Sequence, residues 1–235
     1  MSAVHPQLPL GLRLGDHARF RNFFAGPNAE VLAALRVLAE AGARMVYCSG
    51  APGTGKSHLL QATCAAAREQ GRTAWYLPLE PQLSPAVLEG LEQQEVLCLD
   101  DLQRGAGHAA WEEALFHLYN RVREQEGVLL VAGDGRPEEL GLALPDLVSR
   151  LHWGLLYRLR ELDDAERLAA LQLRAASRGL DLPVETGDYL LRRCPRDLPA
   201  LFELLDRLDL ASLAAQRRLT IPFVRAVLLP GNPGY

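Results

Sequence analysis

Long apolar runs are absent from this chain of 235 residues. No stretch of 18 uncharged apolar residues occurs, so the sequence predicts no membrane-spanning helix. The first residues also lack the basic and then apolar pattern of a secretory signal, and we therefore expect a cytoplasmic protein.

An excess of basic residues is also absent, because 25 Lys and Arg face 29 Asp and Glu, which gives a net charge of −4. Proteins that coat nucleic acid usually carry a basic patch and a high pI, so the composition argues against that class. Cysteines are few and show no CxxC or Cys/His metal spacing. We interpret Cys48, Cys64, Cys98 and Cys194 as small buried apolar groups rather than disulfide partners or metal ligands.

The sequence does contain a complete phosphate-binding motif, GxxxxGK[ST], at residues 50–57. An apolar run of strand length precedes it at 44–48, and a helix-forming stretch follows it. Glycines let backbone N–H groups close around phosphate oxygens, and the helix N-terminus adds its positive end. We expect the nucleotide to be bound by Gly50, Pro52, Gly53, Thr54, Gly55, Lys56, Ser57 and His58.

Strand and helix patterns alternate through the first two thirds of the chain, which favours an α/β fold with a five-stranded parallel sheet flanked by helices. The expected strands are 44–48, 73–77, 95–99, 127–132 and 154–158. The main helices expected beside them are 28–41, 56–70 and 109–125. After Leu162 only helical patterns remain, at about 163–177, 184–193, 197–213 and 221–228. We therefore expect a tail at 1–18, a nucleotide-binding base at 19–162 and a helical subdomain at 163–235.

Two carboxylates end the predicted strand at 95–99, about 45 residues after the phosphate motif. Asp100 is placed to hold Mg²⁺ opposite Ser57, and Asp101 is placed to polarise an attacking water. Asp134 follows the next strand. It either bonds the water or γ-phosphate region, or it caps the loop before Pro137.

Three further features allow two interpretations each. Arg150 either reaches the nucleotide of a neighbouring subunit or is an ordinary surface arginine. Arg196 either lies over the phosphates or is a surface arginine near a helix cap. The tail residues Gln7, Leu8, Leu10 and Leu12 form an extended apolar pattern, which either docks on a partner or packs on its own domain.

Together these motifs resemble the AAA+ ATPases of the DnaA clade, over nearly the whole chain from about Phe20 to Leu229. The matched stretches are GAPGTGKSHLL, VLCLDDLQ, residues 133–137, SRLHWG and residues 196–198. Within the clade the chain is similar to the Hda group of DnaA-homologous regulators. The sequence ends soon after LTIPFV, with no residues left for a helix-turn-helix domain, and QLPLGL looks like the clamp-binding peptide of that group.

This resemblance implies a partner, a mechanism and cofactors. The protein would be tethered by Gln7, Leu8, Leu10 and Leu12 to the polymerase sliding clamp, and it would reach DNA only through that clamp. It would stimulate hydrolysis of DnaA-bound ATP and so act as a negative regulator of replication initiation. The cofactors would be ADP, or ATP, with Mg²⁺ held by Ser57 and Asp100.

The resemblance also implies roles for three residues. Arg150 matches the arginine finger, offered in trans, Arg196 matches the sensor arginine of the lid, and Asp134 occupies the first-sensor position. Many AAA+ proteins have Asp-Glu at Asp100-Asp101 and Asn at Asp134, so we expect weak intrinsic hydrolysis at most. A homodimer through the finger face is compatible with this clade. The alternatives are a helicase loader of the DnaC type and a P-loop kinase.

Overall fold

The computed structural model describes residues 18–41, 45–195 and 197–228, and these form two compact units. Of the described residues, the first unit contains 18–21 and 28–159, and the second contains 22–27 together with the helical region from Arg160 onward. The domain boundaries predicted from the sequence assign residues 22–27 to the base, whereas the structure groups this short segment with the helical unit. In the described residues, no helix is long and apolar enough to cross a membrane.

The first unit is a five-stranded sheet in the order β2-β3-β4-β1-β5, and every strand pair is parallel. The predicted fold is confirmed, and most strand boundaries differ from the prediction by one residue. The strands are β1 (Met45–Ser49), β2 (Ala74–Pro78), β3 (Val96–Asp100), β4 (Val128–Gly133) and β5 (Leu155–Arg158).

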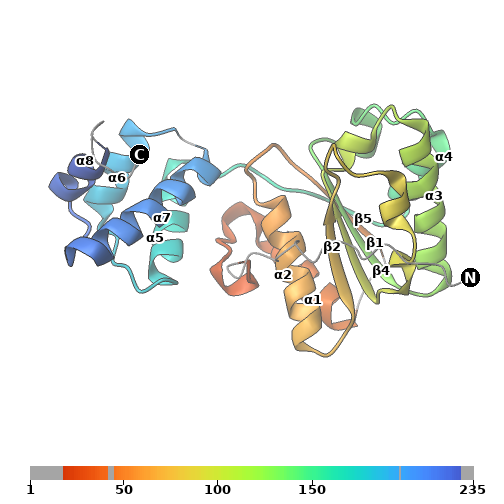
Figure 1. The fold of residues 1–235 in the computed structure, drawn as a ribbon, viewed down its shortest axis with the longest axis horizontal. Coiled ribbons are helices and arrows are strands. Elements are labelled where there is room, and N and C mark those ends of the chain that lie inside the picture. The colour runs from red at the N-terminus through yellow and green to blue at the C-terminus, as the bar shows by residue number, and fades with distance from the viewer. Residues whose placement is uncertain (1–17, 42–44, 196, 229–235) are drawn as a thin grey trace, which may run out of the picture. The chain divides into compact units, whose positions relative to one another are not determined.

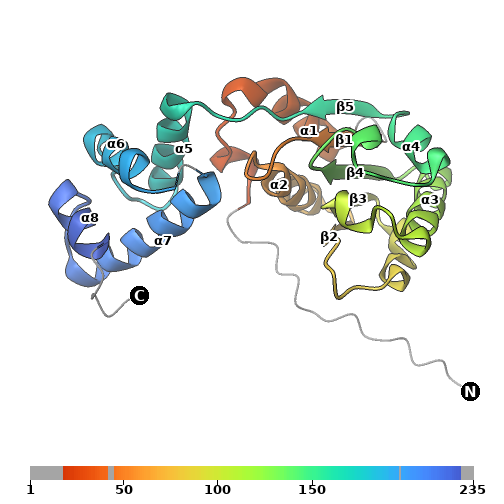
Figure 2. The ribbon, with the colours of Figure 1, turned by 90° about the horizontal axis from the view of Figure 1, so that it is seen from above.

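Helices cover both faces of this sheet (Figures 1 and 2). One face carries α1 (Ala29–Ala41) and α2 (Lys56–Glu69), and the other carries α3 (Ala109–Glu124) and α4 (Pro145–Leu151). The three central strands β1, β3 and β4 are buried almost throughout, as expected for a parallel sheet with two covered faces. Short 3₁₀ turns connect these elements at Phe20–Asn22, Gly26–Asn28, Pro85–Leu88, Leu91–Gln93, Leu102–Gly105 and Pro137–Glu139.

The second unit contains four helices in its described residues. They are α5 (Asp164–Ala176), α6 (Val184–Arg193), α7 (Leu198–Ala215) and α8 (Ile221–Leu228). Asp163 caps α5 by accepting from the N–H of Glu166, and the Glu166 carboxylate accepts from the N–H of Asp163. The apolar faces of the four helices meet in a separate core that includes Leu171, Leu190, Leu201, Leu205 and Val224.

The cysteines are free thiols, of which Cys48, Cys64 and Cys98 are buried and Cys194 is half-buried. Burial raises the pKa of the Cys48 thiol to about 12, so this side chain remains a neutral apolar group at neutral pH.

A buried carboxylate fixes the segment that leads into α4. Glu112, on α3, accepts from the N–H of Gly107 at 2.7 Å, of Ala143 at 3.0 Å and of Leu144 at 2.6 Å. Only 1% of the residue is exposed. It therefore ties α3 to the loop from which α4 starts.

Replacing Glu112 with leucine should lower the free energy of unfolding by about 3 kcal/mol, because three backbone N–H groups lose their acceptor. Urea unfolding followed by circular dichroism measures this change. The matched control is Glu113→Leu, since Glu113 is exposed on the same helix and its replacement should alter stability by less than about 0.5 kcal/mol. Equal stability of the two variants would contradict this role for Glu112.

Candidate functional site

Three neighbouring strands end at the same edge of the sheet, and each is followed by polar residues. The phosphate motif follows β1, Asp100 is the last residue of β3, and Asp134 comes directly after β4. Because β4 lies between β1 and β3, these three chain segments lie side by side. Ligands of open parallel sheets bind at this carboxyl edge.

The loop from Gly50 to Gly55 has the backbone shape that a phosphate cradle requires. Gly53 and Gly55 have φ angles of 81° and 97°, which residues other than glycine rarely adopt. A Cβ atom on Gly50 would lie 2.8 Å from Oγ1 of Thr54, whose hydroxyl donates to the carbonyl of Ala51 at 2.8 Å. The loop leads directly into α2, a 14-residue helix whose N-terminus favours anions.

Lys56 is the buried cation of this site, with 6% of the residue exposed. Its ammonium donates to the carbonyl oxygens of Gly50 at 2.6 Å and Ala51 at 3.1 Å, and to Oδ1 of Asp134 at 2.9 Å. The ammonium is thus held beside the loop, and the carboxylate of Asp134 balances its charge.

Asp100 is the buried anion of the site, with 1% of the residue exposed. Its Oδ2 accepts from the hydroxyl of Tyr76 at 2.8 Å, and its Oδ1 accepts from the N–H of Asp101 at 2.9 Å. Burial raises the pKa of this carboxyl group, while hydrogen bonds from the Ser57 and Tyr76 hydroxyls oppose the rise. A carboxylate beside a serine hydroxyl and a phosphate loop is a suitable donor set for Mg²⁺.

Asp101 has a left-handed backbone, with a φ angle of 58°, which turns the chain sharply after β3. Its carboxylate accepts from Gln103 at 3.1 Å and lies 3.2 Å from Nε of Arg104. Gln103 also donates to Oδ2 of Asp134 at 2.9 Å, so one amide links the two carboxylates that the sequence nominates. Lys56, Asp101 and Asp134 therefore belong to a single polar network.

Arg150 lies elsewhere, near the C-terminus of α4 and shortly before β5 begins. This is the amino edge of the sheet, whereas the phosphate loop lies at the carboxyl edge. The guanidinium stacks on Trp153, with Cζ 3.9 Å from the ring centroid, and it lies 5.7 Å from the centroid of Phe116. Arg150 forms no ion pair with any residue that the structure describes.

Of the remaining residues predicted for the site, the structure describes His58 only. His58 has Nε2 3.0 Å from the carbonyl oxygen of Arg19, so one ring nitrogen contacts the segment before α1. Arg196 and the tail residues Gln7, Leu8, Leu10 and Leu12 lie outside the described residues.

Two side chains of this site are not marked by any predicted motif. Tyr76 reaches Asp100 from a neighbouring strand, and no motif signals it, because the contact depends on strand order. Gln103 stands inside VLCLDDLQ, three residues after Asp100, and its proximity to the acidic pair was the available signal.

Comparison with known proteins decides the family. The model of the bacterial DnaA ATPase domain matches residues 14–158, which is more than half of the chain, and the model described as "Hda, lid domain" matches residues 164–228. The chain belongs to the DnaA/Hda clade of AAA+ proteins. The clade that the motifs indicated is thereby confirmed, and the helical unit contains the lid.

Solved structures agree with this fold. Domain III of DnaA from Thermotoga maritima superposes with a TM-score of 0.78 at 21% identity, covering 92% of this chain and 97% of that one. AMPPCP-bound DnaA from Aquifex aeolicus gives 0.71 at 24% identity, covering 86% and 68%. The Thermotoga maritima RuvB branch migration motor gives 0.64 at 17% identity, covering 86% and 67%.

Proposed function

We propose that this DnaA/Hda-clade protein is an ADP-bound, clamp-tethered negative regulator of replication initiation that stimulates hydrolysis of DnaA-bound ATP. The observation that carries the proposal is the position of Arg150. It lies at the opposite edge of the sheet from the chain's own phosphate loop, stacked on an exposed tryptophan and without a carboxylate partner among the described residues. Such a guanidinium is available for the triphosphate of another protein.

The chain's own nucleotide site has a binding role in this proposal. Lys56 and the loop amides hold the phosphates, and Ser57 and Asp100 hold Mg²⁺, which would balance the phosphate charge. Two features support weak hydrolysis of its own nucleotide. The carboxylate of Asp101 is paired with Arg104 and Gln103, and that of Asp134 is paired with Lys56, and these partners lower the basicity that either carboxylate offers to a water.

Tyr76 should orient the carboxylate of Asp100 for metal binding, because its hydroxyl donates a hydrogen bond to one oxygen of that carboxylate. Tyr76→Phe should raise the Mg²⁺ concentration needed for half-maximal tightening of ADP binding by about tenfold, as for other second-layer partners of metal ligands. Affinity for ADP in EDTA should not change. Titration of a fluorescent ADP analogue with Mg²⁺ measures both quantities. Tyr189→Phe, in the helical unit, is the control, and an equal response of the two variants would contradict this role.

The tethering part of the proposal rests on the tail sequence. Gln7, Leu8, Leu10 and Leu12 would supply the contacts to the sliding clamp, and binding to clamp on DNA would raise the local concentration of the regulator. Removal of residues 1–12 should abolish clamp binding and leave nucleotide binding intact. Clamp affinity that survives this truncation would remove the tail from the proposal.

A single-turnover assay tests the proposal as a whole. Labelled ATP is bound to DnaA, and the protein is added in its ADP form, with and without sliding clamp loaded on DNA. Faster loss of DnaA-bound ATP only with loaded clamp is the expected result. An unchanged rate under every condition would overturn the proposal and direct attention to the helicase-loader alternative.

A further inference from the structure

One buried carboxylate contacts both the loop that leaves the nucleotide site and the segment that begins the helix of Arg150. Oε1 of Glu112 accepts from the N–H of Gly107 at 2.7 Å, and Oε2 accepts from the N–H of Leu144 at 2.6 Å. Oε1 also accepts from the N–H of Ala143 at 3.0 Å. The proposed function does not use this group, although its three hydrogen bonds and its burial hold it firmly in place.

The Gly107 side of this contact leads back to the nucleotide site. Asp101 begins a series of tight turns, because its carbonyl accepts from the N–H of Arg104 at 2.9 Å. The carbonyl of Gln103 then accepts from the N–H of Ala106 at 3.3 Å, directly before Gly107. The side-chain amide of Gln103 links the two carboxylates of the site. A shift of these carboxylates on nucleotide binding would therefore reach Gly107 through a short, hydrogen-bonded segment.

The Leu144 side of the contact leads to Arg150. Leu144 directly precedes α4, and its carbonyl accepts from the N–H groups of Leu147 at 3.1 Å and Val148 at 3.3 Å. It is therefore part of the first turn of this helix. Arg150 lies in the last turn of the same helix, which has seven residues. Since so short a helix moves as one piece, the position of Leu144 sets the position of the Arg150 guanidinium.

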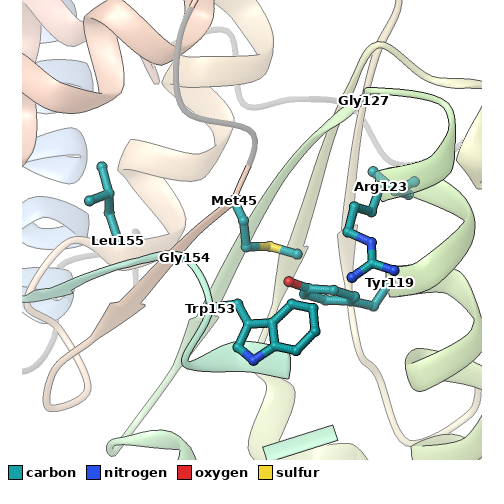
Figure 3. A pocket seen from close by; sticks show the side chains of 8 residues that line it. Met45, Tyr119, Arg123, Gly127, Trp153, Gly154 and Leu155 are labelled. Carbon is teal, nitrogen blue, oxygen red and sulfur yellow. The ribbon is translucent and has the colours of Figure 1, made fainter. Parts of the chain in front are cut away.

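One side of α3 follows this path along most of the helix. Four residues, spaced by four, three and four positions, share that side: Glu112, Phe116, Tyr119 and Arg123. Cζ of Arg150 lies 5.7 Å from the ring centroid of Phe116, and Cζ of Arg123 lies 5.3 Å from that of Trp153. Figure 3 shows Tyr119 and Trp153 lining one hollow, with the guanidinium of Arg123 beside Tyr119. The helix α3 thus connects Glu112 to the stacked pair of Arg150 and Trp153.

We infer that Glu112 is a positioning residue, which joins the loop after β3 to α4 and so makes the position of Arg150 depend on the chain's own nucleotide. This inference deepens the proposed function and rests on it, because the rate that Arg150 controls is the hydrolysis of DnaA-bound ATP. The phosphate loop lies at the carboxyl edge of the sheet, whereas Trp153 precedes β5 at the amino edge. A response of Trp153 to ADP must therefore pass through the protein.

The first test follows Trp153 by fluorine NMR. Fluorotryptophan replaces the three tryptophans of the full-length protein, and the Trp153 signal is identified by its loss in Trp153→Phe. Saturating ADP with Mg²⁺ should shift this signal in the wild type. The shift should vanish in Glu112→Gln, because an amide has a single acceptor oxygen and cannot accept from both Gly107 and Leu144. The Kd for ADP should stay within about threefold of the wild-type value.

Two further variants separate this role from a loss of folding. Glu112→Asp keeps the charge but has a shorter side chain, which cannot reach both segments, so the shift should vanish in this variant as well. Glu113→Gln changes an exposed carboxylate on the same helix and should respond as the wild type does. Binding of ADP by each variant shows that its nucleotide-binding unit is folded.

The second test measures hydrolysis of DnaA-bound ATP in single turnovers, at increasing concentrations of the protein with loaded clamp. Glu112→Gln should lower the maximal rate by roughly 10- to 10²-fold, because a guanidinium displaced by about 1 Å fits the transition state poorly. The half-saturating concentration should not change, since Glu112 is buried and contacts no partner. A general loss of folded protein would instead raise the apparent half-saturating concentration.

The outcomes distinguish this inference from the proposed function. A wild-type Trp153 signal that ignores ADP overturns the inference, and so does a full shift in both Glu112 variants. Equal loss of the shift in Glu113→Gln overturns the assignment to Glu112. A wild-type maximal rate of Glu112→Gln overturns the control of Arg150. If the wild type never accelerates hydrolysis, the proposed function is wrong, and the Trp153 signal still decides whether Glu112 connects the nucleotide site to α4.

Discussion

Replacing Lys56 with methionine should weaken nucleotide binding by roughly 10²- to 10³-fold, the largest effect expected at this site. The ammonium is 6% exposed and already held against the phosphate loop by two carbonyls and Asp134. Each charge-assisted hydrogen bond to a phosphate oxygen contributes about 1.5–3 kcal/mol, and two such bonds account for the expected loss. Titration with a fluorescent ADP analogue measures the change in Kd.

Lys56 is the only lysine in the sequence, which gives this prediction an independent measurement. Reductive methylation modifies the Lys56 amine and the N-terminal amine, and bound ADP should slow the modification of Lys56, which peptide mass spectrometry measures. The matched control is Arg104→Met, which removes an exposed cation paired with Asp101 and should leave the affinity for ADP within about threefold. If the Lys56→Met protein binds ADP with the Kd of the wild type, the assignment of this loop as the phosphate-binding site is wrong.

Replacing Arg150 with alanine should remove most of the stimulation of DnaA-bound ATP hydrolysis, by roughly 10³-fold in the maximal rate, as for other arginine fingers. The chain's own affinity for ADP should not change, because Arg150 lies at the amino edge of the sheet and its phosphate loop at the carboxyl edge. Single-turnover hydrolysis at a saturating concentration of the regulator measures the first quantity, and ADP titration measures the second.

Arg150→Lys provides a second point in this comparison. Lysine keeps the charge but lacks the planar fork that contacts two oxygens and stacks on Trp153, so it should restore only a small part of the rate. Arg225→Ala, on an exposed position of α8, should behave as the wild type. If Arg150→Ala stimulates hydrolysis fully, another group supplies the positive charge, and the finger assignment is wrong.

The fold could be predicted from the sequence because its signals are local. Apolar runs at 44–48, 95–99 and 127–132 are continuous since both faces of the central strands are buried, and the structure places β1, β3 and β4 within one residue of those runs. The cap formed by Asp163 and Glu166 is local in the same way, because its two hydrogen bonds join residues three positions apart.

Residues that act across the sheet could not be predicted in this way. Tyr76 meets Asp100, and Glu112 meets Ala143 and Leu144, over separations of 24 to 32 residues, and no local pattern marks either pair. The stacking of Arg150 on Trp153 could be predicted, since both residues stand in SRLHWG. Arg123, whose guanidinium also lies over the Trp153 ring, comes from α3, and no local pattern marks that contact.

Consecutive residues with fixed backbone requirements encode the phosphate loop, the acidic end of β3 and the change to an all-helical unit. Which of these groups meet depends instead on the order of the strands in the sheet. The strand order inserts β4 between β1 and β3, and this brings Asp134 to Lys56 while α4 and β5 hold Arg150 at the opposite edge. Pairing order is set by packing of the whole sheet, and no single segment encodes it.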